Sequence, residues 1–237
     1  MTVSDNRIFA LVWRIIGLAV GIAGCAVMFS TTMGKTMLVY FTMQTNLFIV
    51  ALFAVLTVMT AVQITREGRR GEAAHLNCSF QLALTFYITI TFVVYWTMLS
   101  WQNFNMSGAG GGNAFLAANY IVHGVVPALA IVDWVLFLPH GRVPRAAAWT
   151  WLIYPVVYAV FIFVRAEVGG PIYGTTRYPY PFIDVDLIGA WVAAVAVAMA
   201  AAFYGLGRLY VFADDKIACR LLKGTAVYER IERTRER

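Results

Sequence analysis

The sequence has few charged residues for its length. Of its 237 residues, 13% are charged and 61% are apolar, whereas soluble globular domains are about a quarter charged and about half apolar. Mean hydropathy is +0.72. So little charge, together with 15% aromatic residues, excludes an intrinsically disordered chain. The composition predicts a polytopic membrane protein with little mass outside the bilayer.

Cysteines are also scarce. The three in the chain, Cys25, Cys78 and Cys219, are odd in number and widely spaced, so they indicate neither a disulfide framework nor a metal site. We therefore expect no metal and no cofactor. The net charge of +6 comes from cations at the ends of apolar runs. A basic stripe with interleaved aromatic residues is lacking, which argues against nucleic-acid binding.

Long apolar runs dominate what remains. A membrane-spanning helix needs about 20 mostly apolar residues, and continuous runs of this length favour helices over the alternating segments of a barrel. The first run is too long for a cleaved signal peptide and lacks a cleavage site, so we expect it to stay in the membrane. The sequence predicts an all-α bundle of six transmembrane helices: Ile8–Phe29, Phe41–Ile64, Ser79–Ser100, Ala114–Leu138, Ala147–Val164 and Val185–Phe212.

Cationic residues collect on one side of these spans. Because cytoplasmic loops carry the excess of lysine and arginine, both termini are expected in the cytoplasm of a multi-pass protein of the cell (plasma) membrane. Residues 1–212 form the expected transmembrane domain and 213–237 a basic cytoplasmic tail. The side predicted to be cytoplasmic has Arg7, Arg66, Arg69, Arg70, Arg142, Arg145, Lys216, Arg220, Lys223, Arg230, Arg233, Arg235 and Arg237, against Lys35 and Arg177 opposite.

Small residues indicate where helices approach one another. Gly17 and Gly21 form a Gly-x-x-x-Gly pair in the first span, and the last span has a dense alanine series between Ala190 and Ala202. Both features favour close helix packing within one bundle, and a dimer interface stays open as an alternative. The oligomeric state does not follow from the sequence.

Polar side chains at membrane depth are costly, and they indicate functional sites. In the second span, Thr42, Thr45 and Asn46 share one helical face near the predicted outer end. The alternative for each threonine is structural, because such hydroxyls often bond to a carbonyl one turn earlier or cap a helix.

The fourth span has a second polar group. Asn119, His123 and Pro127 follow one another at i+4 spacing, so the Asn119 amide is placed to hydrogen-bond the imidazole and fix its tautomer. Pro127 has no N–H, which leaves the carbonyl of His123 without its helical partner. One tilted helix pair would bring His123 beside Thr42. Asp133, near the cytoplasmic end of this span, is expected to pair with a basic residue.

An aromatic segment precedes the last span. It contains Tyr178, Tyr180 and Phe182 beside two prolines. Such residues form either an interfacial anchor belt or a lid that walls off a lipid-facing pocket.

These motifs, taken in order, resemble those of the six-transmembrane-protein family related to the androgen-induced and androgen-dependent membrane proteins. The matching residues are Tyr40, Thr42, Asn46 and Leu47 in span two, Asn119, His123 and Pro127 in span four, and Tyr180-Pro181-Phe182 before span six. The resemblance implies a six-span bundle. It also implies a threonine hydrolase of fatty acid esters of hydroxy fatty acids.

The resemblance implies Thr42 as nucleophile and His123 as general base. The chain departs from the family pattern because Asn46 follows Thr42 at +4 instead of +3. Thr45 is therefore a second candidate nucleophile, and a gapless alignment places Met43 at that position.

The remaining expectations concern the substrate. A threonine hydroxyl needs a base within hydrogen-bonding distance. We expect oxyanion donors among Gln44 and Asn46, with Asn119, Tyr178, Tyr180 and Phe182 completing the binding site. The expected partners are membrane lipids and a fatty-acyl ester substrate. The alternatives are a non-catalytic lipid-binding or scaffold protein and a small-solute transporter, which the scarcity of intramembrane charge disfavours.

Overall fold

The computed structural model describes residues 1–31, 33–101, 112–172 and 174–223. The described residues are all-helical and contain no strand, and six helical segments are long and apolar enough to cross a membrane. The six-helix prediction is thereby confirmed. The segments are α1 (Arg7–Phe29), α2 (Phe41–Glu67), α3 with a π-helical turn (Cys78–Val94, Tyr95–Leu99), α4 with a π-helical turn and α5 (Asn113–Tyr120, Ile121–Val125, Val126–Phe137), α6 with α7 (Ala147–Thr150, Ile153–Val168) and α9 (Trp191–Leu222).

The last span is placed differently from its predicted position. Residues 185–188 form a separate short helix, α8 (Val185–Ile188), and α9 begins only at Trp191. Gly189 ends α8 with φ 55°, a left-handed conformation that glycine adopts without steric cost. The helix α9 continues to Leu222, into the segment assigned to the tail. The rest of that tail, 224–237, lies outside the described residues.

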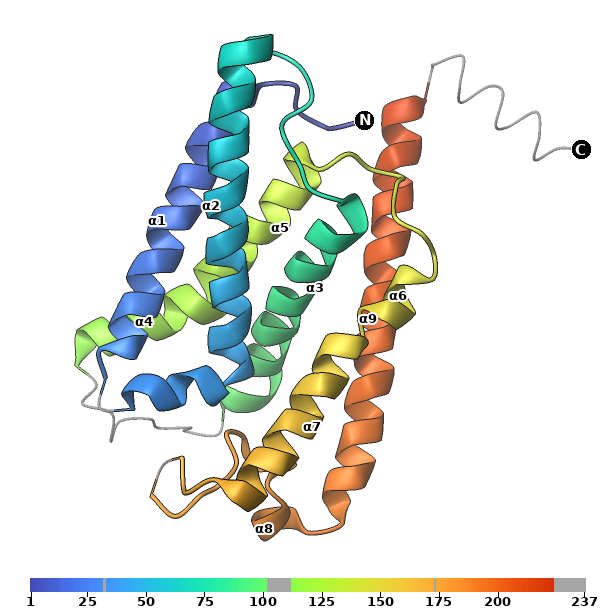
Figure 1. Cartoon of the computed structure of the whole chain (residues 1–237). Coiled ribbons are helices and arrows are strands. Elements are labelled where there is room, and N and C mark those ends of the chain that lie inside the picture. Colours follow the sequence, from blue (N-terminus) through green and yellow to red (C-terminus); the bar gives the residue numbers. More distant parts are fainter. Residues whose placement is uncertain (32, 102–111, 173, 224–237) are drawn as a thin grey trace, which may run out of the picture.

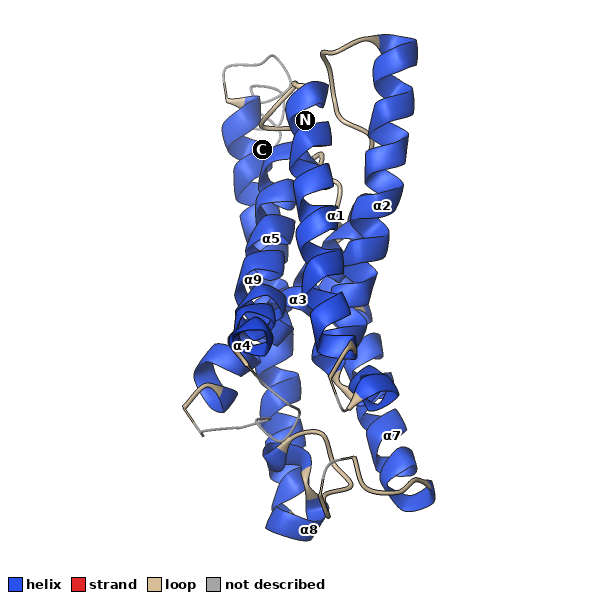
Figure 2. Ribbon diagram, turned by 90° about the vertical axis from the view of Figure 1, so that its left-hand side faces the viewer, coloured by secondary structure: helices blue, strands red, loops and turns tan. Residues whose placement is uncertain are grey.

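The helices form an elongated bundle with two distinct ends. Helices α1, α2, α3 and α4–α5 pack against one another, and α9 contacts α3 and α6. In Figure 1 α7 and α9 lie on the far side of α3 from α1, and Figure 2 shows the two helices apart from each other. The N-terminus and the C-terminal end of α9 lie at the same end (Figure 1), here called the terminal end. At the opposite, distal end, α1 and α7 finish and α2 and α9 begin.

Glycine allows the close contact between α1 and α2. A Cβ atom on Gly17 would lie 2.6 Å from the ring of Phe53, and one on Gly21 would lie 2.8 Å from the side chain of Val50. The expected Gly-x-x-x-Gly packing is therefore present. The alanines of the last span behave differently, because those between Ala190 and Ala202 are all exposed.

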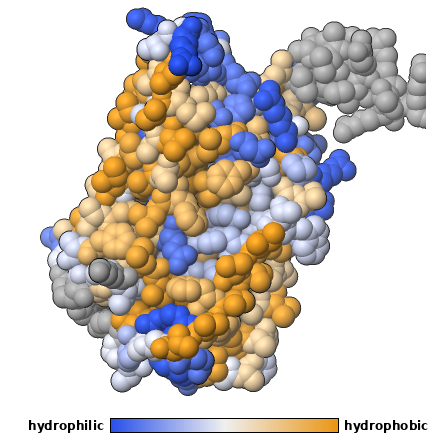
Figure 3. Space-filling view, in the orientation of Figure 1, coloured by the Kyte–Doolittle hydropathy of each residue, from blue (hydrophilic) through white to orange (hydrophobic). Residues whose placement is uncertain are grey.

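The bundle surface is apolar across its middle. In Figure 3 hydrophobic residues cover most of the visible face, and hydrophilic residues gather at the terminal end, with smaller groups near the centre and at the distal end. Val58, Val157 and Leu209 are each more than half exposed. Large apolar side chains exposed around a helical bundle are expected where the surroundings are lipid.

A buried ion pair joins the helices near the terminal end. Arg14 of α1 is fully buried and contacts Asp133 of α5 at 3.0 Å. It also donates to the Thr60 hydroxyl at 2.6 Å and to the carbonyl of Ala74 at 2.8 Å. The prediction that Asp133 pairs with a basic residue is confirmed. This pair ties α1, α2, α5 and the 68–77 loop together.

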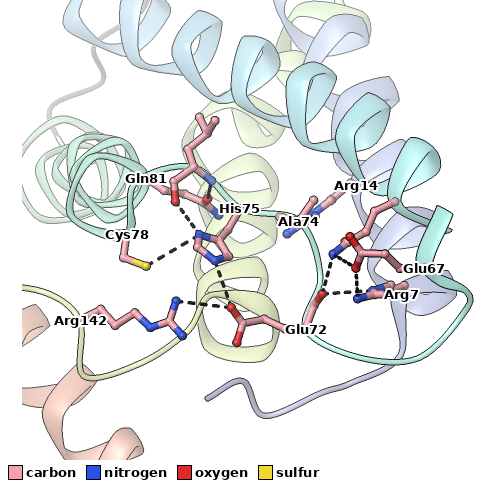
Figure 4. A network of polar contacts seen from close by, with 11 residues as sticks. Arg7, Arg14, Glu67, Glu72, Ala74, His75, Cys78, Gln81 and Arg142 are labelled. Atoms are coloured by element: carbon pink, nitrogen blue, oxygen red, sulfur yellow. Dashed lines mark hydrogen bonds and ion pairs between the residues drawn. The ribbon is translucent and has the colours of Figure 1, made fainter.

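The same loop is held from both sides by further polar contacts (Figure 4). Arg7 pairs with Glu67 at 2.7 Å and donates to the carbonyls of Gly68 and Glu72. Glu72 in turn contacts His75 and Arg142. These contacts fix the terminal end of the bundle, far along α2 from Thr42.

Loss of the Asp133 charge should strongly destabilise the fold. In Asp133→Asn, Arg14 stays buried without a counter-charge, which costs about 3–5 kcal/mol. Unfolding in mixed micelles, followed by tryptophan fluorescence, measures the change. Asp5→Asn is the control, because its 3.7 Å contact with Arg70 is exposed and should contribute less than about 1 kcal/mol. Equal small losses in both variants would contradict a structural role for the buried pair.

Candidate active site

Thr42 lies in the first turn of α2 at the distal end of the bundle. The backbone of Tyr40 is extended, and α2 starts at the next residue, Phe41, without a side-chain cap. The Thr42 side chain is buried and its Oγ1 lies 3.2 Å from Nε2 of His123. The structure thus brings together the two residues that the resemblance implies as nucleophile and base, although they lie 81 positions apart in the sequence.

A backbone contact fixes the tautomer of His123. Its Nδ1 lies 2.9 Å from the carbonyl oxygen of Asn119. A carbonyl only accepts hydrogen bonds, so Nδ1 carries the proton and Nε2 of the neutral ring presents a lone pair. That lone pair faces the Thr42 hydroxyl. The contact expected from the Asn119 side-chain amide is not made, because this amide donates to the Tyr95 hydroxyl at 2.6 Å.

Two π-helical turns position the imidazole. His123 lies in the turn Ile121–Val125, just before Pro127. The carbonyl that Pro127 leaves free accepts a hydrogen bond from Nε1 of Trp96 at 3.1 Å. The ring of Tyr95 stacks on His123 with centroids 3.9 Å apart. π-helical turns within α-helices are frequent at functional sites. Here the turn Tyr95–Leu99 meets the turn that contains the base.

Asn46 and Gln44 hold the start of α2 in place. The Asn46 amide donates to the carbonyls of Thr42 at 2.8 Å and Val122 at 3.0 Å, which joins α2 to the π-helical turn beside His123. The Gln44 amide donates to the carbonyl of Leu38 at 2.8 Å. The Asn46 amide thus uses both of its N–H groups on backbone carbonyls, and neither Asn46 nor Gln44 lines either of the two cavities beside Thr42. The expectation that they act as oxyanion donors is not met.

Thr45 contacts other partners. Its Oγ1 lies 2.8 Å from Oγ1 of Thr91 and donates to the carbonyl of Thr42 at 3.1 Å. The second contact is the bond to a carbonyl one turn earlier that was the structural alternative. Thr45 therefore links α2 to α3, and Thr42 is the threonine that faces the imidazole.

Two cavities meet at Thr42. The larger one, of about 340 Å³, extends between α7 and α9. The smaller one, of about 50 Å³, contains His123 and Asn119 in its wall. Thr42, Tyr95, Leu99 and Tyr180 line both. The rest of the larger wall consists of Phe41, Ile90, Thr91, Val94, Leu152, Pro155, Val156, Tyr158, Ala159, Val160, Phe163, Phe182, Ile183, Ala196, Met199, Ala200 and Phe203.

The aromatic segment before α9 contributes to the walls of these cavities. Tyr180 and Phe182 stack with centroids 5.2 Å apart, and both line the larger cavity. Tyr178 is also buried, but it packs against Phe163 and lines neither cavity.

An exposed ion pair fixes this segment. Arg177 donates two hydrogen bonds to Asp186, at 3.0 Å and 2.7 Å. These hydrogen bonds lower the pKa of Asp186 below its usual value. The pair therefore stays ionised and holds the segment across the distal end.

Sequence reasoning missed the residues that support the imidazole from α3. Tyr95 and Trp96 contact the ring and the carbonyl of His123, yet aromatic residues near a span end are ordinarily interfacial anchors. The one signal in the sequence was Pro127, which leaves the carbonyl of His123 without a helical partner and so in need of another hydrogen-bond donor. Within the described ranges, no group of three or more histidine, cysteine or acidic side chains is placed to hold a metal ion.

Comparison of the chain with protein-family models, with curated proteins and with solved structures finds no match. The function is therefore inferred from the side chains where the two cavities meet.

Proposed function

We propose that this membrane protein hydrolyses esters of long-chain fatty acids, with Thr42 as nucleophile and His123 as general base. The observation that carries the proposal is the 3.2 Å contact between Thr42 Oγ1 and His123 Nε2, in which Thr42 lines a large apolar cavity. The motif resemblance to the threonine hydrolases supports the same pair. Turnover of a long-chain ester by the purified protein in lipid nanodiscs tests the proposal, and its absence would contradict it.

The chemistry follows acyl transfer to a hydroxyl. Thr42 Oγ1 attacks the ester carbonyl carbon while His123 Nε2 takes the hydroxyl proton. The tetrahedral intermediate collapses, the C–O bond to the alcohol breaks, and the alcohol oxygen receives the proton from Nε2. Water then attacks the acyl-Thr42 ester with His123 again as base, which releases the fatty acid and regenerates the hydroxyl.

The cavities indicate how the substrate lies. The larger cavity is lined almost wholly by apolar side chains and accommodates an acyl chain. Val156 and Val160, which line it from α7, are 55% and 57% exposed, so it reaches the bundle surface beside α9. An ester can therefore enter sideways from lipid. The smaller cavity takes the side of the ester that leaves as the alcohol.

The distribution of charge supports a location for the site. Arg7 begins α1, Arg69 follows the end of α2 and Arg142 follows the end of α5, and these helix ends lie at the terminal end. Cytoplasmic segments carry the cationic excess. We therefore place the terminal end in the cytoplasm and Thr42 within the outer leaflet of the plasma membrane. The lipids of that leaflet would then supply the substrate.

Non-catalytic lipid binding is the alternative that the apolar cavity also supports. Within the described residues, the recorded hydrogen bonds of His123 include no carboxylate, so the ring lacks the acidic partner of a Ser-His-Asp triad. A binding protein would take up fatty acids and esters equally and release the ester unchanged. Product analysis after incubation with an ester separates the two functions.

Narrowing of the larger cavity should change the preferred chain length. Ala159 lines it from α7, and Ala159→Phe fills space that the acyl chain would occupy. We expect kcat/KM for C16 and C18 esters to fall at least tenfold, while C4 esters are affected less than about threefold. Val157→Phe is the matched control, because Val157 lies on the same helix, is 58% exposed and lines neither cavity. An equal loss for all chain lengths would contradict acyl binding there.

A further inference from the structure

The first two backbone N–H groups of α2 donate to side chains instead of to carbonyls of the helix. The first N–H groups of a helix have no partner within it. At this helix, tyrosine hydroxyls take the place of a side-chain cap. The N–H of Phe41 donates to the Tyr158 hydroxyl at 3.1 Å, and the N–H of Thr42 donates to the Tyr180 hydroxyl at 3.4 Å. The Thr42 bond is longer than the usual 2.9–3.0 Å for such a pair.

Tyr180 is held firmly with its hydroxyl beside the nucleophile. The residue is 7% exposed and lines both cavities. Its ring lies between Tyr40, at 5.7 Å in an edge-to-face arrangement, and Phe182, stacked at 5.2 Å. The hydroxyl is therefore held beside Thr42, in the wall of both cavities.

The protonation state of Tyr180 suits a hydrogen-bond donor. Burial raises the pKa of this hydroxyl above its usual value, and contacts with Thr42 oppose the rise only in part. The group therefore remains protonated at neutral pH. It can turn its proton toward a carbonyl oxygen that becomes negative.

The two side chains expected as oxyanion donors, Asn46 and Gln44, line neither cavity. Asn46 and Gln44 donate to backbone carbonyls that keep α2 in position. Attack by Thr42 places negative charge on the former carbonyl oxygen, and acyl transfer needs donors aimed at that atom.

We infer that the hydroxyl of Tyr180 and the backbone N–H of Thr42 together form the oxyanion site. On substrate binding the carbonyl oxygen takes the place between them, and their own 3.4 Å contact is exchanged for two donations to that oxygen. The positive end of the α2 dipole acts in the same direction. This inference rests on the proposed hydrolase function and makes Tyr180 a catalytic residue.

Tyr180→Phe tests it by removing the donor while it keeps the ring. We expect kcat to fall about 10²–10³-fold, with KM changed less than about threefold. Affinity for a long-chain trifluoromethyl ketone, which forms a tetrahedral adduct, should fall in parallel, while affinity for the free fatty acid stays the same. Tyr178→Phe is the matched control, because that ring lies in the same segment but outside both cavities, and it should retain wild-type kcat.

Equal loss of affinity for the ketone and the fatty acid, or an unchanged kcat, would overturn the inference. Should Tyr180→Phe fail to fold, 3-fluorotyrosine incorporated at position 180 keeps the hydroxyl but makes it more acidic, and kcat must then change. Failure of the proposed function is distinguishable. In that case wild-type protein itself shows no turnover, whereas failure of this inference leaves a Thr42-dependent hydrolase that is indifferent to position 180.

Discussion

Replacement of Thr42 by alanine should abolish ester hydrolysis. The variant lacks the hydroxyl that forms the acyl intermediate, so kcat should fall by roughly 10³-fold or more. Thermal stability should change little, because the substitution removes the one contact of Thr42 Oγ1 with His123 Nε2 that is found among the described residues. The assay is steady-state turnover of a C16 ester by purified protein in nanodiscs, with protein folding followed by tryptophan fluorescence.

Thr45→Ala is the control for this substitution. It removes the same atoms one turn further along α2, but Thr45 contacts Thr91 and the carbonyl of Thr42. We expect near-wild-type kcat and a loss of about 1 kcal/mol in stability, typical of one hydrogen bond. A result in which Thr45→Ala is inactive and Thr42→Ala is active would transfer the nucleophile to Thr45 and refute the geometry proposed here.

Replacement of His123 by alanine should have the second largest effect. The variant lacks the Nε2 atom that would accept the proton of the Thr42 hydroxyl. General-base catalysis contributes about 10²–10⁴-fold, so kcat should fall by that factor. The remaining activity should rise with pH, because hydroxide can then take the proton. Added imidazole should restore part of the rate, since the variant leaves space where the ring lay.

The His123→Ala result is interpreted against a second histidine. His75 lies in the 68–77 loop at the terminal end, paired with Glu72 at 3.1 Å. His75→Ala should retain wild-type kcat at every pH. Loss of activity in both variants would indicate a general dependence on folding and would contradict the role of His123 as base.

Hydropathy could predict the six helices because lipid imposes one requirement on every span. Each backbone N–H and C=O must find its partner within the helix, so about 20 apolar residues suffice to identify it. Gly189 marks the limit of this reasoning. Its left-handed conformation separates α8 from α9 within a continuous apolar run. The sequence placed the last span at 185–212 because hydropathy alone does not register such a break.

The candidate site was predictable in part. The i+4 spacing of Asn119, His123 and Pro127 showed that a polar face and a free carbonyl exist in one span. It could not show that the backbone carbonyl of Asn119 would bind the ring, because that contact depends on the π-helical turn Ile121–Val125. Whether a helix contains such a turn follows from packing across the bundle.

The oxyanion donors inferred from the structure differ from those expected from the sequence for a related reason. Backbone N–H groups inside a span are normally used by the helix itself, which left only side chains such as Asn46 and Gln44 as candidates. Thr42 is an exception because α2 starts one residue before it. The N–H of Thr42 is therefore not used by the hydrogen bonds of the helix, and it donates instead to the hydroxyl of Tyr180, 138 positions away in the sequence.

Identification of the residue modified by a long-chain fluorophosphonate tests the central claim most directly. The reagent reacts with an activated hydroxyl in an ester-hydrolase site and leaves a stable phosphonyl group that mass spectrometry of the digested protein can locate. We predict a single adduct on Thr42, formed in proportion to the loss of turnover and lacking in His123→Ala. An adduct on another residue, or an unmodified protein that still hydrolyses the ester, would contradict the assignment.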